Sequence, residues 1–154
     1  MKPRIYVDTS VIGGCLDDEF ETESLALMEM FNTGQAIAVI SDLTDLEVRR
    51  APPWVGEILD RINGSSIEHV GFVDEARDLA QKYVDAGALG NSNLLDAQHI
   101  ATATVSRVDV LVSWNFKHIV NLQRIRMFNS VNVKLGYPMI EIRTPQEVIS
   151  YEER

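Results

Sequence analysis

IYVDTSVIGG, residues 5–14, places three strand-forming apolar residues before an aspartate, two hydroxyl residues and a second apolar pair. The short, continuously apolar run Ile5-Tyr6-Val7 is typical of a strand that is buried on both faces of a parallel sheet. Asp8 comes directly after it. A carboxylate at that point either caps the next helix or binds a cation at the edge of the sheet. This stretch therefore indicates an α/β fold and poses the question of what Asp8 does.

Further apolar segments alternate with helix-forming segments along the chain. Strands are predicted at residues 36–41, 66–70, 108–113 and 139–143, after a first strand at 3–8. Helices are predicted at 10–17, 21–33, 54–62, 73–86 and 121–134. A further helix, capped by Asn91, Ser92 or Asn93, runs to about Val105, and a short helix capped by Ser41 or Asp42 ends before Pro52. A last helix starts at Pro145 with Thr144 as its cap. We expect a single α/β domain over residues 1–154, with a central parallel sheet of four to five strands flanked by helices.

The composition is that of an ordinary globular protein, with 154 residues, 45% apolar and 24% charged. No apolar run approaches the length that spans a membrane, and the N-terminus lacks the features of a signal peptide. The single cysteine, Cys15, excludes an internal disulfide framework and a cysteine-based zinc site. We expect a cytoplasmic protein without membrane attachment.

The formal net charge is −9, which by itself argues against binding nucleic acid through the release of counterions. Two explanations fit this charge. The acidic residues form a solvated surface, or several of them converge on a pocket that holds a cation. Composition does not separate these explanations.

Four oxygen-bearing side chains lie near predicted strand ends or helix starts: Asp8, Glu47, Asp96 and Asn115. Because the carboxyl ends of parallel strands meet at one edge of a sheet, we expect these side chains to converge there. Carboxylate and amide oxygens are the ligands that Mg²⁺ and Mn²⁺ prefer. The set therefore predicts a site for a hard divalent cation that acts on a phosphodiester.

Each of the four also has a local structural explanation. Asp8 is placed to cap the helix that follows it, and Asn115 is placed to cap residues 116–120. Glu47 lies three residues after Thr44, the spacing of a capping box, and capping is the default interpretation for it. Asp96 lies in a first helical turn, where a carboxylate is favoured by the helix dipole. Only the joint placement of the four supports a metal site.

Four segments carry a resemblance to a known family: YVDTSVIGG, AVISDLTDLEVRR, LLDAQHIATA and DVLVSWNFKHIVN, in that order. Together they resemble the PIN domain (PilT N-terminus-like), the fold of metal-dependent ribonucleases that includes the VapC toxins of toxin–antitoxin pairs. The resemblance extends from about residue 3 to about residue 143. It implies an endoribonuclease that uses Mg²⁺ or Mn²⁺ and hydrolyses RNA phosphodiesters with a metal-activated water.

The resemblance also assigns roles to residues of this chain. Asp8, Glu47 and Asp96 correspond to the metal-binding acids, and Asn115 to a fourth, weaker member of the catalytic set. Ser10 and Ser113 correspond to hydroxyls that orient substrate or water. Two departures from the family pattern reduce the negative charge of the site. Asn115 is neutral, and Leu95 precedes Asp96 where a second acid is often found.

Two histidines lie near the predicted site. Asp96 and His99 are three residues apart on one helix, a spacing that metal-binding pairs use, but the apolar neighbours of His99 favour a buried, hydrogen-bonded structural histidine. His118 is closer to the predicted pocket, where it is placed to contact a substrate phosphate.

The resemblance further implies an RNA substrate, an antitoxin protein as partner, and a homodimer. The alternative from another class is a non-catalytic PIN module that binds RNA or a protein partner. The neutral Asn115, the missing second acid and the net charge favour that alternative.

Overall fold

The computed structural model describes the backbone of residues 1–152 and the side chains of residues 1–149. Its five strands are β1 (Arg4–Val7), β2 (Ile37–Ser41), β3 (Ile67–Val70), β4 (Val110–Val112) and β5 (Ile142–Arg143). They form one sheet in the order β3-β2-β1-β4-β5, and every neighbouring pair is parallel. The predicted α/β fold with a parallel sheet of four to five strands is confirmed.

Eight helices connect and cover these strands: α1 (Thr9–Gly14), α2 (Glu21–Asn32), α3 (Asp42–Arg50), α4 (Pro53–Asp60), α5 (Asp74–Asp85), α6 (Leu94–Val105), α7 (Leu122–Lys134) and α8 (Pro145–Glu152). Short 3₁₀ turns, η1 (Gly64–Ser66) and η2 (Asn91–Asn93), precede β3 and α6. Among the described residues, none of these helices is long and apolar enough to cross a bilayer.

The main differences from the predicted elements lie at their ends. The helix predicted over 10–17 ends at Gly14, and residues 15–17 continue as tight turns whose N–H groups bond three residues back. Glycine has a low helix propensity, so the pair Gly13-Gly14 explains why the helix ends early. The last strand has only two residues instead of the predicted 139–143, because only Ile142 and Arg143 pair with β4, which is itself three residues long.

Two predicted helix starts are confirmed by their hydrogen bonds. At α8 the Thr144 hydroxyl accepts the Glu147 N–H, while the Glu147 carboxylate accepts the Thr144 N–H, which is a complete capping box. At α3 the Ser41 hydroxyl accepts the Thr44 N–H at 3.3 Å. Ser41 therefore caps α3, and the capping box predicted from Thr44 and Glu47 does not form.

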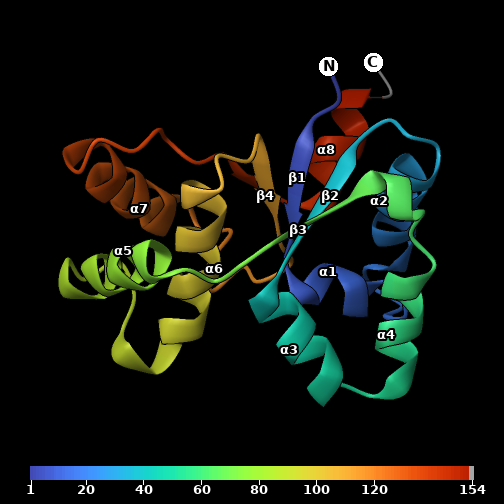
Figure 1. Cartoon of the computed structure of the whole chain (residues 1–154), viewed down its shortest axis with the longest axis horizontal. Coiled ribbons are helices and arrows are strands. Elements are labelled where there is room, and N and C mark those ends of the chain that lie inside the picture. The colour runs from blue at the N-terminus through green and yellow to red at the C-terminus, as the bar shows by residue number, and fades with distance from the viewer. Residues whose placement is uncertain (153–154) are drawn as a thin grey trace.

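The sheet separates two apolar layers (Figure 1). Helices α1, α2 and α4 pack on one face, and α5, α6 and α7 on the other. Successive residues of the central strand alternate between these layers: Ile5 and Val7 belong to the first and Tyr6 to the second. This alternation leaves β1 buried on both faces, as the unbroken apolar run predicted.

Arg4 links β1 to β3 across the intervening strand β2. Its guanidinium donates to both carboxylate oxygens of Glu68, at 2.8 and 2.6 Å, and to the carbonyls of Ser106 and Arg107. The bidentate bond lowers the pKa of Glu68 despite some burial, and it raises the pKa of Arg4.

We predict a small, pH-dependent stabilisation from this pair. Because the pKa of Glu68 is lowered in the folded chain, its contribution is present above the ordinary glutamate pKa and is lost as the pH falls through the folded value. Glu68 is 38% exposed, so solvent limits the contribution to less than about 1 kcal/mol. Urea unfolding of wild type and Glu68→Gln should show a difference at pH 7 that shrinks below about pH 4. A difference that grows on acidification would contradict this assignment.

Candidate functional site

The polar residues of interest lie at the carboxyl ends of the three central strands. Asp8 follows β1, Ser41 ends β2, and Ser113 follows β4. The chain passes from β1 to β2 and β3 on one side and reaches β4 and β5 on the other. The carboxyl ends of β1 and β4 therefore form the topological switch point of the sheet. This is the place where ligands bind in open α/β sheets.

Asp8 is 6% exposed and is oriented by two serines. The hydroxyls of Ser10 and Ser113 both donate to its Oδ2, each at 2.8 Å. The serines are in turn fixed by the backbone, since the N–H groups of Trp114 and Asn115 donate to Ser10 Oγ and Ser113 Oγ. Within the part of the chain described, Asp8 Oδ1 accepts no hydrogen bond, which leaves this oxygen available to a ligand.

The capping alternative for Asp8 is wrong. Asp8 occupies the N-cap position of α1 in an extended conformation, but its carboxylate makes no cap hydrogen bond. Its Oδ2 instead accepts the hydroxyls of Ser10, in α1, and of Ser113, directly after β4.

Glu47 also points away from its own helix terminus. The side chain leaves the middle of α3, and its Oε1 accepts a hydrogen bond from Thr9 Oγ1 at 3.0 Å. The same oxygen lies 2.5 Å from His99 Nε2. The default interpretation of Glu47 as a capping residue is therefore wrong, because Ser41 has already satisfied the start of α3.

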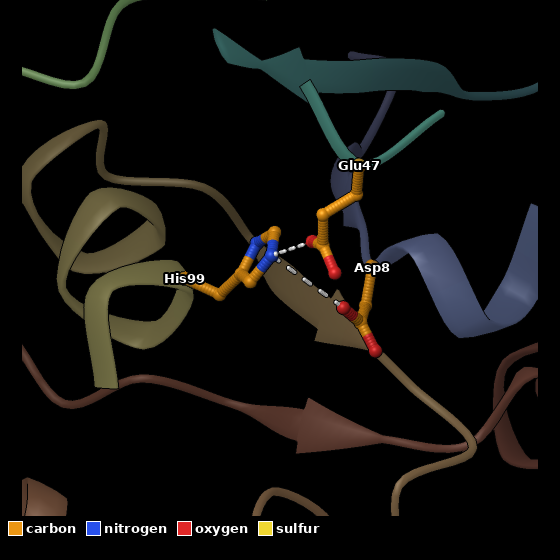
Figure 2. A group of neighbouring side chains, drawn as sticks. All are labelled: Asp8, Glu47 and His99. Carbon is orange, nitrogen blue, oxygen red and sulfur yellow. Dashed lines mark hydrogen bonds and ion pairs between the residues drawn. The ribbon is translucent and has the colours of Figure 1, made fainter. Parts of the chain in front are cut away.

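His99 completes a compact group with the two acids (Figure 2). It is 1% exposed, and its Nε2 also lies 3.9 Å from Asp8 Oδ1. Its other ring nitrogen, Nδ1, is 2.6 Å from the hydroxyl of Tyr6, which is 2.7 Å from Ser41 Oγ. The expectation of a buried, hydrogen-bonded histidine is confirmed, but its place inside the site was missed. The signal in the sequence was its spacing of three residues from Asp96.

One ligand atom from each of Asp8, Glu47 and His99 lies within 4.8 Å of the other two. Two carboxylate oxygens and one imidazole nitrogen suit a divalent transition-metal cation such as Mn²⁺, one of the two metals that the resemblance implies. This group contains an imidazole, and Asp96, one of the three predicted metal ligands, lies outside it.

Asp96 lies beside this group, paired with another histidine. Its Oδ2 is 3.2 Å from His118 Nδ1. Burial and the charge of Asp8 raise the pKa of Asp96, although His118 and His99 act in the opposite direction. Asp96 therefore lies close enough to Asp8 to feel its negative charge.

Asn115 has a local structural role, which was the alternative to its assignment to the catalytic set. Its Oδ1 accepts the His118 N–H at 3.0 Å and so closes the turn that follows β4. This bond helps to position His118 beside Asp96.

The ionisation of Glu47 and His99 is linked. Burial favours a raised pKa for Glu47, but the hydrogen bond and charge of His99 and the bond from Thr9 lower it overall. For His99, burial by itself lowers the pKa. The hydrogen bond to Glu47 and the charges of Asp8, Glu47 and Asp96 act in the opposite direction and raise it overall. Each partner of this ion pair stabilises the charged form of the other.

Comparisons with known proteins found similarity at the level of structure. No protein-family model matches the chain, and the search of curated proteins found no match either. A chain of the DNA-bound VapBC complex from Salmonella typhimurium aligns with a TM-score of 0.58 and 16% identity, over 94% of this chain and 99% of that one. A chain of the VapBC2 complex from Rickettsia felis, bound to a promoter DNA fragment, aligns with a TM-score of 0.56 and 16% identity, over 92% and 98%.

VapC20 from Mycobacterium tuberculosis, described as a toxin that cleaves the sarcin–ricin loop, aligns with a TM-score of 0.55 and 10% identity. The alignment covers 74% of this chain and 92% of VapC20. At these identities the likeness concerns the fold. The chain therefore has the fold of the VapC toxins, the PIN fold that the resemblance of its sequence predicted.

Proposed function

We propose that this protein is a divalent-metal-dependent endoribonuclease of the PIN type and the toxin of a toxin–antitoxin pair. The observation that carries the proposal is the convergence of Asp8, Glu47 and His99 at the switch point of a VapC-like sheet. Asp96 stands beside them as a further acid. We propose RNA as the substrate and the cytoplasm as the place of action.

The residues of the site have separate tasks in this proposal. Asp8 and Glu47 hold the cation. Asp96, beside His118, contributes a further acid to the site. The bonds from Ser10 and Ser113 keep Asp8 Oδ1 turned toward the cation. Asn115 assists by holding the turn that carries His118. When bound, Mg²⁺ or Mn²⁺ supplies activation of water and neutralisation of charge on the phosphodiester.

A groove between α2 and α4 supports the proposal of an antitoxin partner. It has a volume of about 500 Å³, and its apolar lining is formed by Cys15, Leu16, Leu25, Met28, Ile58 and Ile62. Leu16 and Leu25 of this lining are 51% and 50% exposed, so the groove offers apolar side chains to a partner. The structural neighbours from Salmonella typhimurium and Rickettsia felis are complexes of VapB with VapC. We also propose a homodimer.

A second candidate is a PIN module that binds RNA or a protein without cleaving it. The observation that favours it is the engagement of two predicted site residues in other interactions. Asp96 is paired with His118, and Asn115 closes a turn. These contacts leave fewer free ligands than three acids and an amide.

Cleavage of RNA in the presence and absence of metal separates the two candidates. We expect the purified chain to cleave RNA with Mn²⁺ or Mg²⁺ and to lose this activity with a chelator. Asp96→Asn should retain the fold and lower the rate by about tenfold or more, since it removes an acid from the site. RNA that is bound by the chain but stays intact with both metals would support the non-catalytic module.

A further inference from the structure

His99 is placed as a metal ligand rather than only as a support for Glu47. We propose that His99 Nε2 binds the cation directly, together with Asp8 and Glu47, and that the site consequently selects Mn²⁺ and similar transition-metal ions over Mg²⁺. The inference rests on the proposed function only in locating a metal at this site. It replaces an all-oxygen ligand set by two carboxylates and one imidazole.

The hydrogen bonds of the ring are those of a metal-binding histidine. Histidine ligands usually bond through one ring nitrogen to the metal and through the other to a polar partner that fixes the ring and its tautomer. Here Nδ1 lies 2.6 Å from the Tyr6 hydroxyl. If Nδ1–H donates to Tyr6, the Tyr6 hydroxyl is free to donate to Ser41 Oγ, 2.7 Å away. This arrangement leaves Nε2 facing the two carboxylates. In the metal-free chain Nε2 shares a proton with Glu47 Oε1, and a bound cation would take the place of that proton.

The distances are compatible with one shared ion. Ligand atoms about 2.1 Å from a metal and adjacent in an octahedron are about 3 Å apart. The separations of Nε2 from Glu47 Oε1 and from Asp8 Oδ1, 2.5 and 3.9 Å, lie on either side of that value. Only a small shift is needed to admit the ion. Glu47 has the freedom to make it, since its side chain is 33% exposed while His99 and Asp8 are buried.

The donor set determines which metal is preferred. Mg²⁺ is bound by oxygen ligands and retains several waters, whereas imidazole suits transition metals. A neutral His99 with Asp8 and Glu47 as anions balances the two charges of the cation. Asp96, paired with His118, then lies beside the ion and is not one of these three ligands.

Pulsed electron paramagnetic resonance of bound Mn²⁺ tests this proposal directly, because a coordinated imidazole nitrogen modulates the electron spin echo. We would measure the full chain with Mn²⁺ alone, prepared with ¹⁴N- and with ¹⁵N-histidine. The chain has three histidines, so His118→Gln and His69→Gln are matched controls. His69 lies away from the site and is 68% exposed.

We expect a histidine signal in wild type that persists in both control variants and disappears in His99→Gln. The affinity for Mn²⁺ over Mg²⁺, from calorimetry, should fall by about tenfold or more in His99→Gln. If His99→Gln does not fold, the two controls still assign the signal by elimination. Bound Mn²⁺ without histidine coupling, a signal lost in His118→Gln, or no saturable Mn²⁺ binding would each overturn the inference.

The same experiments separate this inference from the proposed function. Metal-dependent RNA cleavage without a histidine signal would leave the nuclease standing and refute the role of His99. A signal that depends on His99 in a chain that does not cleave RNA would support the role of His99 and refute the nuclease.

Discussion

Asp8→Asn is expected to lower metal-dependent RNA cleavage by about 100-fold or more and to remove saturable Mn²⁺ binding. A catalytic cation contributes several kcal/mol, and each 1.4 kcal/mol corresponds to a factor of ten in rate. The serine hydroxyls that donate to Asp8 Oδ2 favour the amide oxygen of asparagine at that position. The amide NH₂ group then points toward Glu47 and His99, where it repels a cation. Calorimetry with Mn²⁺ and a cleavage assay measure both effects.

The matched control is Asp78→Asn, which removes one exposed carboxylate from α5 and changes the net charge equally. Its metal affinity and cleavage rate should equal those of wild type. Because asparagine preserves the shape of Asp8 and its hydrogen bonds, the circular dichroism spectrum should also be unchanged. Full activity of folded Asp8→Asn would refute the assignment of Asp8 to the metal.

Gly14→Ala is expected to destabilise the fold by about 2 kcal/mol, within the range for overpacking a close-packed core. A Cβ at this position would lie 2.7 Å from Ser24 Oγ and 3.0 Å from two atoms of the Trp114 ring. Neither neighbour can move freely, since Trp114 Nε1 donates to Ser24 Oγ at 2.8 Å and the indole stacks on Phe20 with ring centres 4.4 Å apart. Thermal unfolding should show a melting temperature lower by about 4–8 °C.

Gly13→Ala provides the control for this prediction at the preceding residue. A Cβ at Gly13 would meet no atom within 4 Å, and alanine is the better helix former. Gly13→Ala should therefore be neutral or stabilising by up to about 1 kcal/mol. Equal destabilisation by both substitutions would show that the contacts with Ser24 and Trp114 are not what limits this position.

Gly14 is also coupled to the site through Trp114. The Trp114 N–H donates to Ser10 Oγ, and Ser10 donates to Asp8. A displacement of Trp114 therefore reaches the carboxylate that we assign to the metal. The glycine at the end of the opening motif is required by packing, while the aspartate in it is directed by hydrogen bonds.

Local patterns were enough to predict the strand before Asp8, the parallel sheet and the helix cap at Thr144. These features depend on periodicity and on contacts between residues that are close in the chain. The same kind of pattern was misleading at Glu47. Thr44 and Glu47 have capping-box spacing, but Ser41 caps α3, and the Glu47 carboxylate binds Thr9 and His99 instead.

The sequence by itself determined that an acid follows a buried central strand and that other acids are available to join it. The tertiary structure alone decided which side chains lie against that acid. His99 reaches Glu47 across 52 positions of the chain, and Ser113 reaches Asp8 across 105. Such pairings follow from the order of the strands and the packing of α6 against the sheet, which no local spacing encodes. For that reason the sequence offered Asp8, Glu47 and Asp96 as metal ligands and did not reveal that His99 lies against Asp8 and Glu47.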